Sequence, residues 1–155
     1  MRLGHQIVSL FIWIGICFIP AVIGSRFSPG DWYARLAKPS WTPPGFIFGP
    51  VWTLLYTTMG IAAWLLWKRV EFSAARVAFM LFIVQLIFNG MWSWIFFGLH
   101  KPGFAFVELC FLWALILATL IMFWNLYRPS GILLVPYLAW VTFAAILNFA
   151  IWWLN

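Results

Sequence analysis

The sequence is poor in charged residues, in acids and in the side chains that bind metals. Only 8% of its 155 residues are charged, three of them acidic, and it contains two His and two Cys. A soluble domain carries about 25% charged residues, so this chain cannot cover a surface that faces water. The scarcity excludes a soluble domain. Without clustered acids, His or Cys, the chain also shows no acid–base pair, nucleophile or metal site.

The two cysteines are too isolated to form a disulfide framework. Cys17 and Cys110 each lie inside an apolar segment, with no C-x-x-C spacing and no neighbouring His. We therefore predict that both are small, buried, apolar side chains and that neither binds a metal.

Long apolar segments are what the chain has in abundance. Its residues are 66% hydrophobic, and its mean hydropathy is +1.01. Five segments approach the ~20 residues that cross a bilayer as a helix, namely 7–23, 46–67, 75–98, 104–127 and 132–154. The net charge of +6 lies mostly in the breaks between them, as in membrane proteins and unlike a nucleic-acid-binding surface. We predict an all-α integral membrane protein with the lipid membrane, and no nucleic acid, as its partner.

Three of the four connections are short, and only the first, residues 24–45, is long. Short connections make consecutive helices pack antiparallel in one bundle, so residues 1–155 are predicted to form a single domain. The first segment follows Arg2 and His5, as a signal peptide would. Its core is long, however, and no A-x-A-like cleavage site precedes Ser25. We predict that it is a retained span.

Polar and aromatic side chains recur at helical spacing on three of the predicted spans. Offsets of three, four, seven, eight and eleven residues place them on one face of each helix. The three stripes are Trp52, Tyr56 and Met59; Gln85, Asn89, Trp92, Ser93 and Phe96; and Tyr137, Trp140, Ala144 and Asn148. Such faces either line a pocket inside a bundle or bond one helix to the next. The stripes alone favour bonding between helices.

Glu108 is an acid inside the fourth predicted span, about five residues from its start. It is either an interfacial side chain that reaches up to water or a buried acid bonded to a neighbouring helix. No second acid lies near it in the sequence to form a catalytic pair.

The most specific patterns are three blocks: DWYARLAKPSWTPPGFIFGPVWTLLY (31–56), QLIFNGMWSWIFFG (85–98) and VPYLAWVTFAAILN (135–148). Together they resemble the TspO/MBR family, the tryptophan-rich sensory proteins that include the mitochondrial translocator protein. The resemblance implies a bundle of five transmembrane helices whose first loop, residues 24–45, folds as a lid over its mouth, with a short helical turn at 31–37.

The prolines of the first loop fit a lid, because a stiff backbone loses less entropy when it closes over a pocket. The resemblance places Pro43 and Pro44 at the end of the lid. Pro50 then lies in the first turns of the second helix, where its missing N–H costs little.

The resemblance also implies a ligand site on the faces that the stripes select. Members of the family bind porphyrins and synthetic isoquinoline or benzodiazepine-type ligands. The matching positions here are Tyr33, Trp41, Pro43, Trp52, Tyr56, Asn89, Trp92, Trp140 and Ala144. A flat tetrapyrrole such as protoporphyrin IX can stack on these rings, with its carboxylates near Arg35 or Lys38. The resemblance further implies a homodimer in a bacterial cell membrane.

Two departures from the family limit what the resemblance implies. The last span ends in LNFAIWWLN, where Phe149 replaces the tyrosine of the sterol-recognition pattern and no Lys or Arg follows. Sterol binding through that pattern is therefore not predicted. His5 and His100 lie at the ends of spans, so the ligand is expected to be a metal-free porphyrin, or a haem without axial coordination, and nothing is expected to be bound covalently.

Three functions remain open. The first is a tetrapyrrole-binding sensor or regulator. The second is a transporter, although five helices without an inverted repeat lack the usual alternating-access design. The third is light-dependent porphyrin degradation. Because no catalytic group is visible, that activity would be photochemistry at Trp52 and Trp140. The sequence favours the binding function.

Overall fold

The computed structural model describes residues 2–155, and the regular structure in that range is entirely helical. The elements are α1 (Leu3–Gly24), α2 (Gly30–Arg35), α3 (Gly45–Arg69), α4 (Phe72–Ser93), the π-helical turn η1 (Trp94–Gly98), α5 (Pro102–Leu126) and α6 (Arg128–Leu154). Five helices are long and apolar enough to cross a membrane, with α4 and η1 forming one of them. The prediction of five spanning helices is confirmed, and each helix begins before its predicted start.

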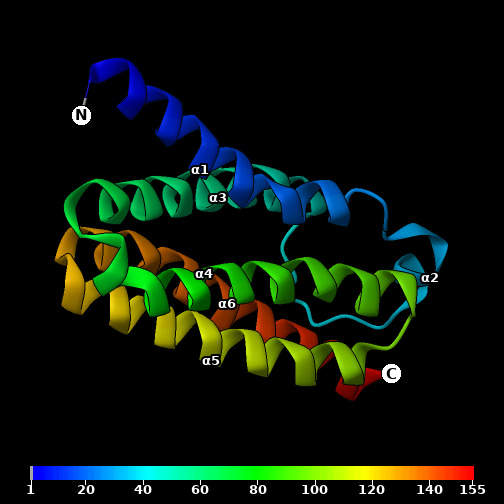
Figure 1. Cartoon of the computed structure of the whole chain (residues 1–155). Coiled ribbons are helices and arrows are strands. Elements are labelled where there is room, and N and C mark those ends of the chain that lie inside the picture. The colour runs from blue at the N-terminus through cyan, green and yellow to red at the C-terminus, as the bar shows by residue number, and fades with distance from the viewer. Residues whose placement is uncertain (1) are drawn as a thin grey trace.

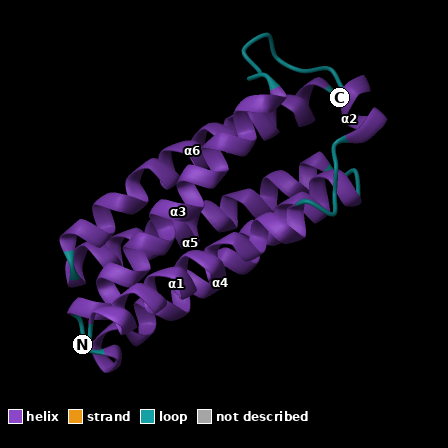
Figure 2. Cartoon of the chain, turned by 90° about the horizontal axis from the view of Figure 1, so that it is seen from above, coloured by secondary structure: helices purple, strands orange, loops and turns teal. Residues whose placement is uncertain are grey.

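The five long helices form a ring around a shared interior. α1 packs on α3 and α4, α3 packs on α6, and α5 packs on both α6 and α4. Figures 1 and 2 show the bundle with its N- and C-termini at opposite ends. The short helix α2 lies at the same end as the C-terminus. An odd number of spans places the termini on opposite sides of the bilayer.

Helix α1 is the most weakly buried of the five, with only Cys17 and Pro20 inside the protein. Its N-terminal end leaves the bundle, as Figure 1 shows. It approaches α3 closely at one point, where a Cβ on Gly60 would lie 2.6 Å from the Cα of Ile14. Because lipid is as apolar as the helix faces, helices in a membrane associate largely through close packing at small residues. Gly60 therefore permits the α1–α3 contact.

The two cysteines differ in their surroundings. Cys17 is fully buried in the core, whereas Cys110 is exposed on the outer face of α5. The prediction that Cys110 is buried is wrong. An apolar segment fixes the depth of a residue in the membrane, but the rotation of the helix decides whether the residue faces the bundle or the lipid.

The first connection is anchored at two points in its middle, Trp32 and Ala37. The backbone N–H of Ala37 donates to Oδ1 of Asn155 (3.0 Å), and Nδ2 of Asn155 donates to the carbonyl oxygen of Ala37 (2.9 Å). Near α2, the ring of Trp32 stacks on His100, with centroids 4.3 Å apart and planes 8° from parallel. The connection is therefore fixed to both the end of α6 and the turn before α5. Its role as a lid stays a prediction.

Local structure in this connection departs from the prediction in two details. The helical turn spans Gly30–Arg35 rather than 31–37, and Leu36 is already extended. Helix α3 begins at Gly45, directly after Pro44. Pro50 is thus the sixth residue of α3, beyond the first four residues whose N–H groups lack a helical partner. It removes a hydrogen bond that the carbonyl of Phe46 would otherwise accept.

Candidate functional site

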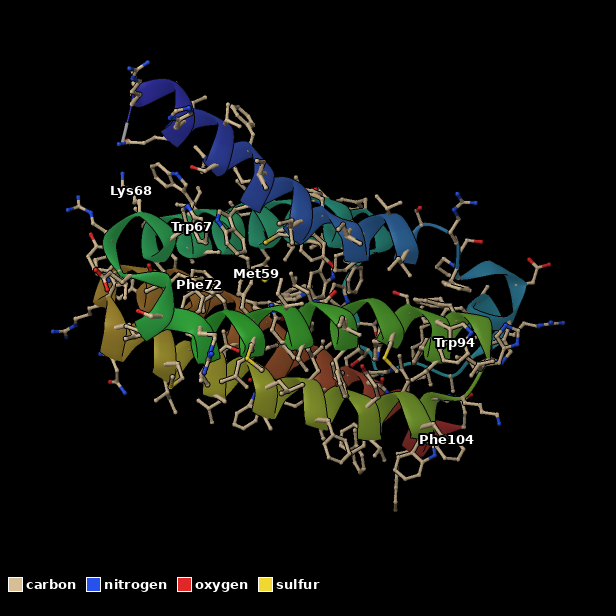
Figure 3. The ribbon with its side chains drawn as sticks, in the orientation of Figure 1. Met59, Trp67, Lys68, Phe72, Trp94 and Phe104 are labelled. Carbon is tan, nitrogen blue, oxygen red and sulfur yellow. The ribbon has the colours of Figure 1, made fainter. Side chains whose placement is uncertain are left out.

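A buried hydrogen-bond network joins three helices in the middle of the bundle. The hydroxyl of Tyr56 donates to Oδ1 of Asn89 (2.8 Å), and Nδ2 of Asn89 donates to the hydroxyl oxygen of Tyr137 (2.7 Å). The Tyr137 hydroxyl in turn donates to Oε1 of Gln85 (2.7 Å). Met59, which Figure 3 shows between α3 and α4, lies 3.9 Å from Nε2 of Gln85 through its sulfur. These stripe residues bond one helix to the next, as the stripes alone suggested.

Trp52 lies directly on this network. Its ring stacks on Tyr56 with centroids 5.3 Å apart and meets Tyr137 edge-on at 6.2 Å. Since Trp52 is one helical turn closer to the first connection than Tyr56, the network forms the floor beneath it. The structure thus brings together three predicted site residues, Trp52, Tyr56 and Asn89.

Trp92 is held from a second direction. Its Nε1 donates to Oδ1 of Asn148 (2.9 Å), and Nδ2 of Asn148 donates to the carbonyl oxygen of Pro102 (2.8 Å). Its ring stacks on Phe96 at 5.0 Å. Phe96 belongs to the π-helical turn η1, in which the N–H of Leu99 bonds five residues back to Trp94. Such turns are rare and occur often at functional sites.

Tyr33 packs the first connection against the π-helical turn η1. Its ring meets Phe96 and Phe97 edge-on, at 6.1 and 5.5 Å. Burial raises the pKa of the Tyr33 hydroxyl, so this group is protonated at neutral pH. The Nζ of Lys38 lies 4.3 Å from the Tyr33 ring centroid and donates to the carbonyls of Tyr33 and Leu36. Lys38 is therefore engaged in holding α2.

Trp140 belongs to a third aromatic group on α3 and α6. It meets Phe48 edge-on at 5.8 Å and Phe143 at 5.3 Å, and Phe143 also contacts Trp41 at 5.9 Å. Trp41 itself is exposed. The last two predicted residues are partly buried: Ala144 packs against the core from α6, and Pro43 precedes α3.

Two rings in this region were missed by sequence reasoning. Phe48 lies one turn before Trp52, and Phe143 lies three residues after Trp140. The same helical spacing that selected the stripes would have found both, but as apolar rings in an apolar segment they carried no separate signal.

Three side chains in residues 2–155 have buried polar atoms without a hydrogen-bond partner. They are both carboxyl oxygens of Glu108, Nε1 of Trp140 and Oγ of Ser130. Glu108 is only 7% exposed. Neither sequence-based alternative for Glu108 is fully correct, because the acid is buried but not bonded to a neighbouring helix.

The predicted residues do not line two apolar grooves on the surface of the bundle. A groove of about 600 Å³ lies between α1 and α4, and one of about 450 Å³ lies between α5 and α6 on the outer surface. Both are almost wholly apolar. The aromatic residues of the predicted site instead contact other rings, as Trp52 does with Tyr56, Trp92 with Phe96 and Trp140 with Phe48.

Five long apolar helices around a largely apolar interior define a multi-pass integral membrane protein. Comparison with known families agrees with the blocks quoted above. The model of the TspO/MBR family matches residues 9–154. The chain belongs to the TspO/MBR family.

Characterised relatives match the chain along nearly its whole length. The tryptophan-rich protein TspO of Chlorobaculum tepidum is 42% identical, over 99% of this chain and 99% of the relative. Protein CrtK of Rhodobacter capsulatus is 39% identical, over 96% and 94%. The human translocator protein is 40% identical, over 88% and 81%.

Proposed function

We propose that this protein is a membrane sensor or regulator that binds a tetrapyrrole inside the loop-side half of its helix bundle. The ligand, a protoporphyrin or a haem without axial coordination, lies between Trp52, Trp92 and Trp140 beneath residues 24–45. The same site accepts synthetic isoquinoline or benzodiazepine-type ligands. The protein works as a homodimer in a bacterial cell membrane.

The observation that carries this proposal is that three helices each place a tryptophan one turn to the loop side of a residue in one polar network. Trp52 comes from α3, Trp92 from α4 and Trp140 from α6. The floor beneath Trp52 is the Tyr56–Asn89 hydrogen bond, whose donor and acceptor both belong to the protein. Large rings of this kind suit a flat, largely apolar ligand, because they offer stacking surface at low entropy cost. One relative, from Cereibacter sphaeroides and 37% identical, is named a tryptophan-rich sensory protein, which supports a sensory role.

Transport is the weaker alternative, although several relatives are named translocator proteins. The floor of the site joins α3, α4 and α6 through three hydrogen bonds between buried groups. A ligand that passed through the bundle would have to break all three in surroundings without water, where unpaired polar groups are costly. A site that is closed below by this network is better suited to binding than to passage.

Titration with protoporphyrin tests the proposal directly. Purified protein in detergent should bind one protoporphyrin per chain with quenching of tryptophan emission, at about micromolar affinity, or about −8 kcal/mol. Trp140→Ala should weaken binding by about 1–3 kcal/mol, because a buried stacking surface is lost. Trp153→Ala is the matched control, since Trp153 lies on the same helix and is 78% exposed.

The position of the site is tested separately from its existence. If wild type and the double variant Trp52→Ala/Trp140→Ala bind protoporphyrin equally well, the ligand lies elsewhere on the protein. If wild-type protein binds no tetrapyrrole, the proposed function is wrong.

A further inference from the structure

The polar atoms of the bundle interior are almost all paired with one another. Tyr56, Asn89, Tyr137 and Gln85 bond in sequence, and Trp92 bonds Asn148 as described above. The exceptions on the loop-side half are the Glu108 carboxyl and the Trp140 indole N–H. Buried polar groups in native proteins are nearly always satisfied, so each exception calls for an explanation.

Helix register places Glu108 at the level of the proposed ligand site. Nε1 of Trp113 donates to Oγ1 of Thr142 (2.8 Å), and the rings of Phe106 and Phe149 are 5.3 Å apart. Because α5 and α6 run antiparallel, Glu108 lies opposite the stretch of α6 between these two contacts. That stretch contains the predicted ligand residue Ala144.

The face of α5 that carries Glu108 points into the bundle. Ala105, Leu109 and Leu112 share this face and are at most 3% exposed. Val107 and Phe111, which flank Glu108 on the side of α5 away from these residues, are more than half exposed to the surroundings of the bundle, so Glu108 lies at the edge of the inward face. Both carboxyl oxygens of Glu108 are nevertheless buried, so the side chain turns inward from this edge and not along the outside of its helix.

An unpaired carboxyl in this position destabilises the protein that contains it. The group loses its hydration on folding and gains no hydrogen bond in return. No Lys, Arg or His within residues 2–155 forms an ion pair with it, so the neutral acid is the form that the apolar surroundings tolerate. A neutral carboxyl both donates and accepts a hydrogen bond.

We propose that Glu108 is a ligand-binding residue, which hydrogen-bonds a polar group of the molecule that enters the loop-side half of the bundle. The Trp140 N–H supplies a second contact from α6. The ligand class is a flat, largely apolar molecule with an acceptor for the indole N–H and an O–H, N–H or carbonyl group for the carboxyl. This role rests on the proposed function, since it concerns the same site.

The test compares three variants by protoporphyrin titration and by thermal unfolding without ligand. Glu108→Leu should weaken binding about 10-fold, the effect of one lost hydrogen bond in a buried site, while the ligand-free protein becomes as stable as wild type or more stable. Glu108→Gln, which keeps a donor and an acceptor, should bind within about 3-fold of wild type. Ser130→Ala is the matched control, because it removes the third unpaired buried group at the other end of α6 and should bind as wild type does.

Several outcomes would overturn the role of Glu108. Wild-type affinity in Glu108→Leu together with lowered thermal stability would make Glu108 a structural residue. An equal loss of protoporphyrin affinity in Glu108→Gln and Glu108→Leu would mean that the ligand binds an ionised carboxylate instead of a neutral carboxyl. Equal loss in Ser130→Ala would show that the effect is not local. If wild type itself binds no protoporphyrin, the proposed function and this role fail together, whereas binding by wild type with no change in Glu108→Leu overturns this role alone.

Discussion

The two halves of the bundle interior are both rich in aromatic side chains but differ in their polar atoms. In the half away from the first connection, Phe82 stacks on Phe123 at 5.6 Å and Trp13 stacks on Phe79 at 5.1 Å. Small residues such as Ala62 fill the space between helices there and are fully buried. Figure 3 shows Trp67 and Phe72 toward the end of that half. It is a closed apolar core.

The loop-side half places rings beside hydrogen-bonding groups. Trp52 covers a hydroxyl–amide network, Trp92 bonds an asparagine, and Trp140 and Glu108 retain unpaired polar atoms. The difference shows that an abundance of tryptophan and phenylalanine does not by itself indicate a ligand site. The hydrogen-bond network beneath Trp52 and the unpaired groups of Glu108 and Trp140 distinguish the half that is suited to binding. By contrast, the closed half contains one unpaired hydroxyl within residues 2–155, that of Ser130.

The largest effect is expected from a substitution in the closed half that leaves the loop-side half unchanged. Phe82→Ala should lower the free energy of unfolding by about 3 kcal/mol or more, because it leaves a cavity in a fully buried position. Protoporphyrin affinity of the folded fraction should not change. Unfolding in detergent measures the first quantity, and fluorescence titration measures the second. Phe104→Ala, which removes a side chain exposed on the outside of α5, should alter neither. A larger loss of affinity in Phe82→Ala than in Trp140→Ala would erase the distinction between the halves.

A smaller effect is expected at the network that separates the halves. Tyr137→Phe removes the donor to Gln85 and the acceptor for Asn89. It should cost about 1 kcal/mol of stability, in line with hydrogen bonds between membrane helices. Tyr127→Phe is the control, because that hydroxyl makes no hydrogen bond to another group in residues 2–155. Equal unfolding curves for Tyr137→Phe and wild type would mean that the floor does not hold the helices together.

The first connection should have a still smaller effect, confined to ligand exchange. Replacing Pro43 and Pro44 with Ala should keep the fold and weaken binding by less than about 1 kcal/mol, because a more flexible connection loses more entropy on closing. The change should appear mainly as faster dissociation in stopped-flow measurements. Pro129→Ala, near the start of α6, controls for loss of a proline elsewhere. Aggregation or loss of helicity in the double variant would instead show that these prolines serve folding.

The smallest expected effect concerns light. Bound porphyrin should be stable in the dark, since a single carboxyl without a second acid or base beside it does not form an acid–base pair. Under illumination with oxygen, Trp52→Phe and Trp140→Phe at saturating porphyrin should slow its loss modestly, because phenylalanine stacks but is much harder to oxidise. Porphyrin absorbance over time, lit and dark, measures the loss. Equal loss in detergent alone would reduce it to photobleaching, and steady turnover in the dark would require a catalytic group not found here.

The sequence could predict which helix faces carry the site, but it could not predict which of the site residues contact one another. The stripes selected Tyr56 and Asn89 because side chains three or four positions apart in the sequence lie on one face of a helix. That these two bond each other, 33 residues apart in the chain, depends on how α3 and α4 are rotated against one another. The unpaired state of Glu108 depends in the same way on what neighbouring helices place beside it.

The sequence by itself determined the class of the protein and its five spanning helices, because hydropathy over about 20 residues is a local property that the bilayer selects. The tertiary structure alone decided that Cys110 faces outward, that Asn155 bonds Ala37, and that Glu108 is buried without a partner. These features depend on how each helix is rotated and on the order of the helices around the bundle. Both are set by the sum of many weak packing contacts between segments far apart in the chain. No single segment contains that information.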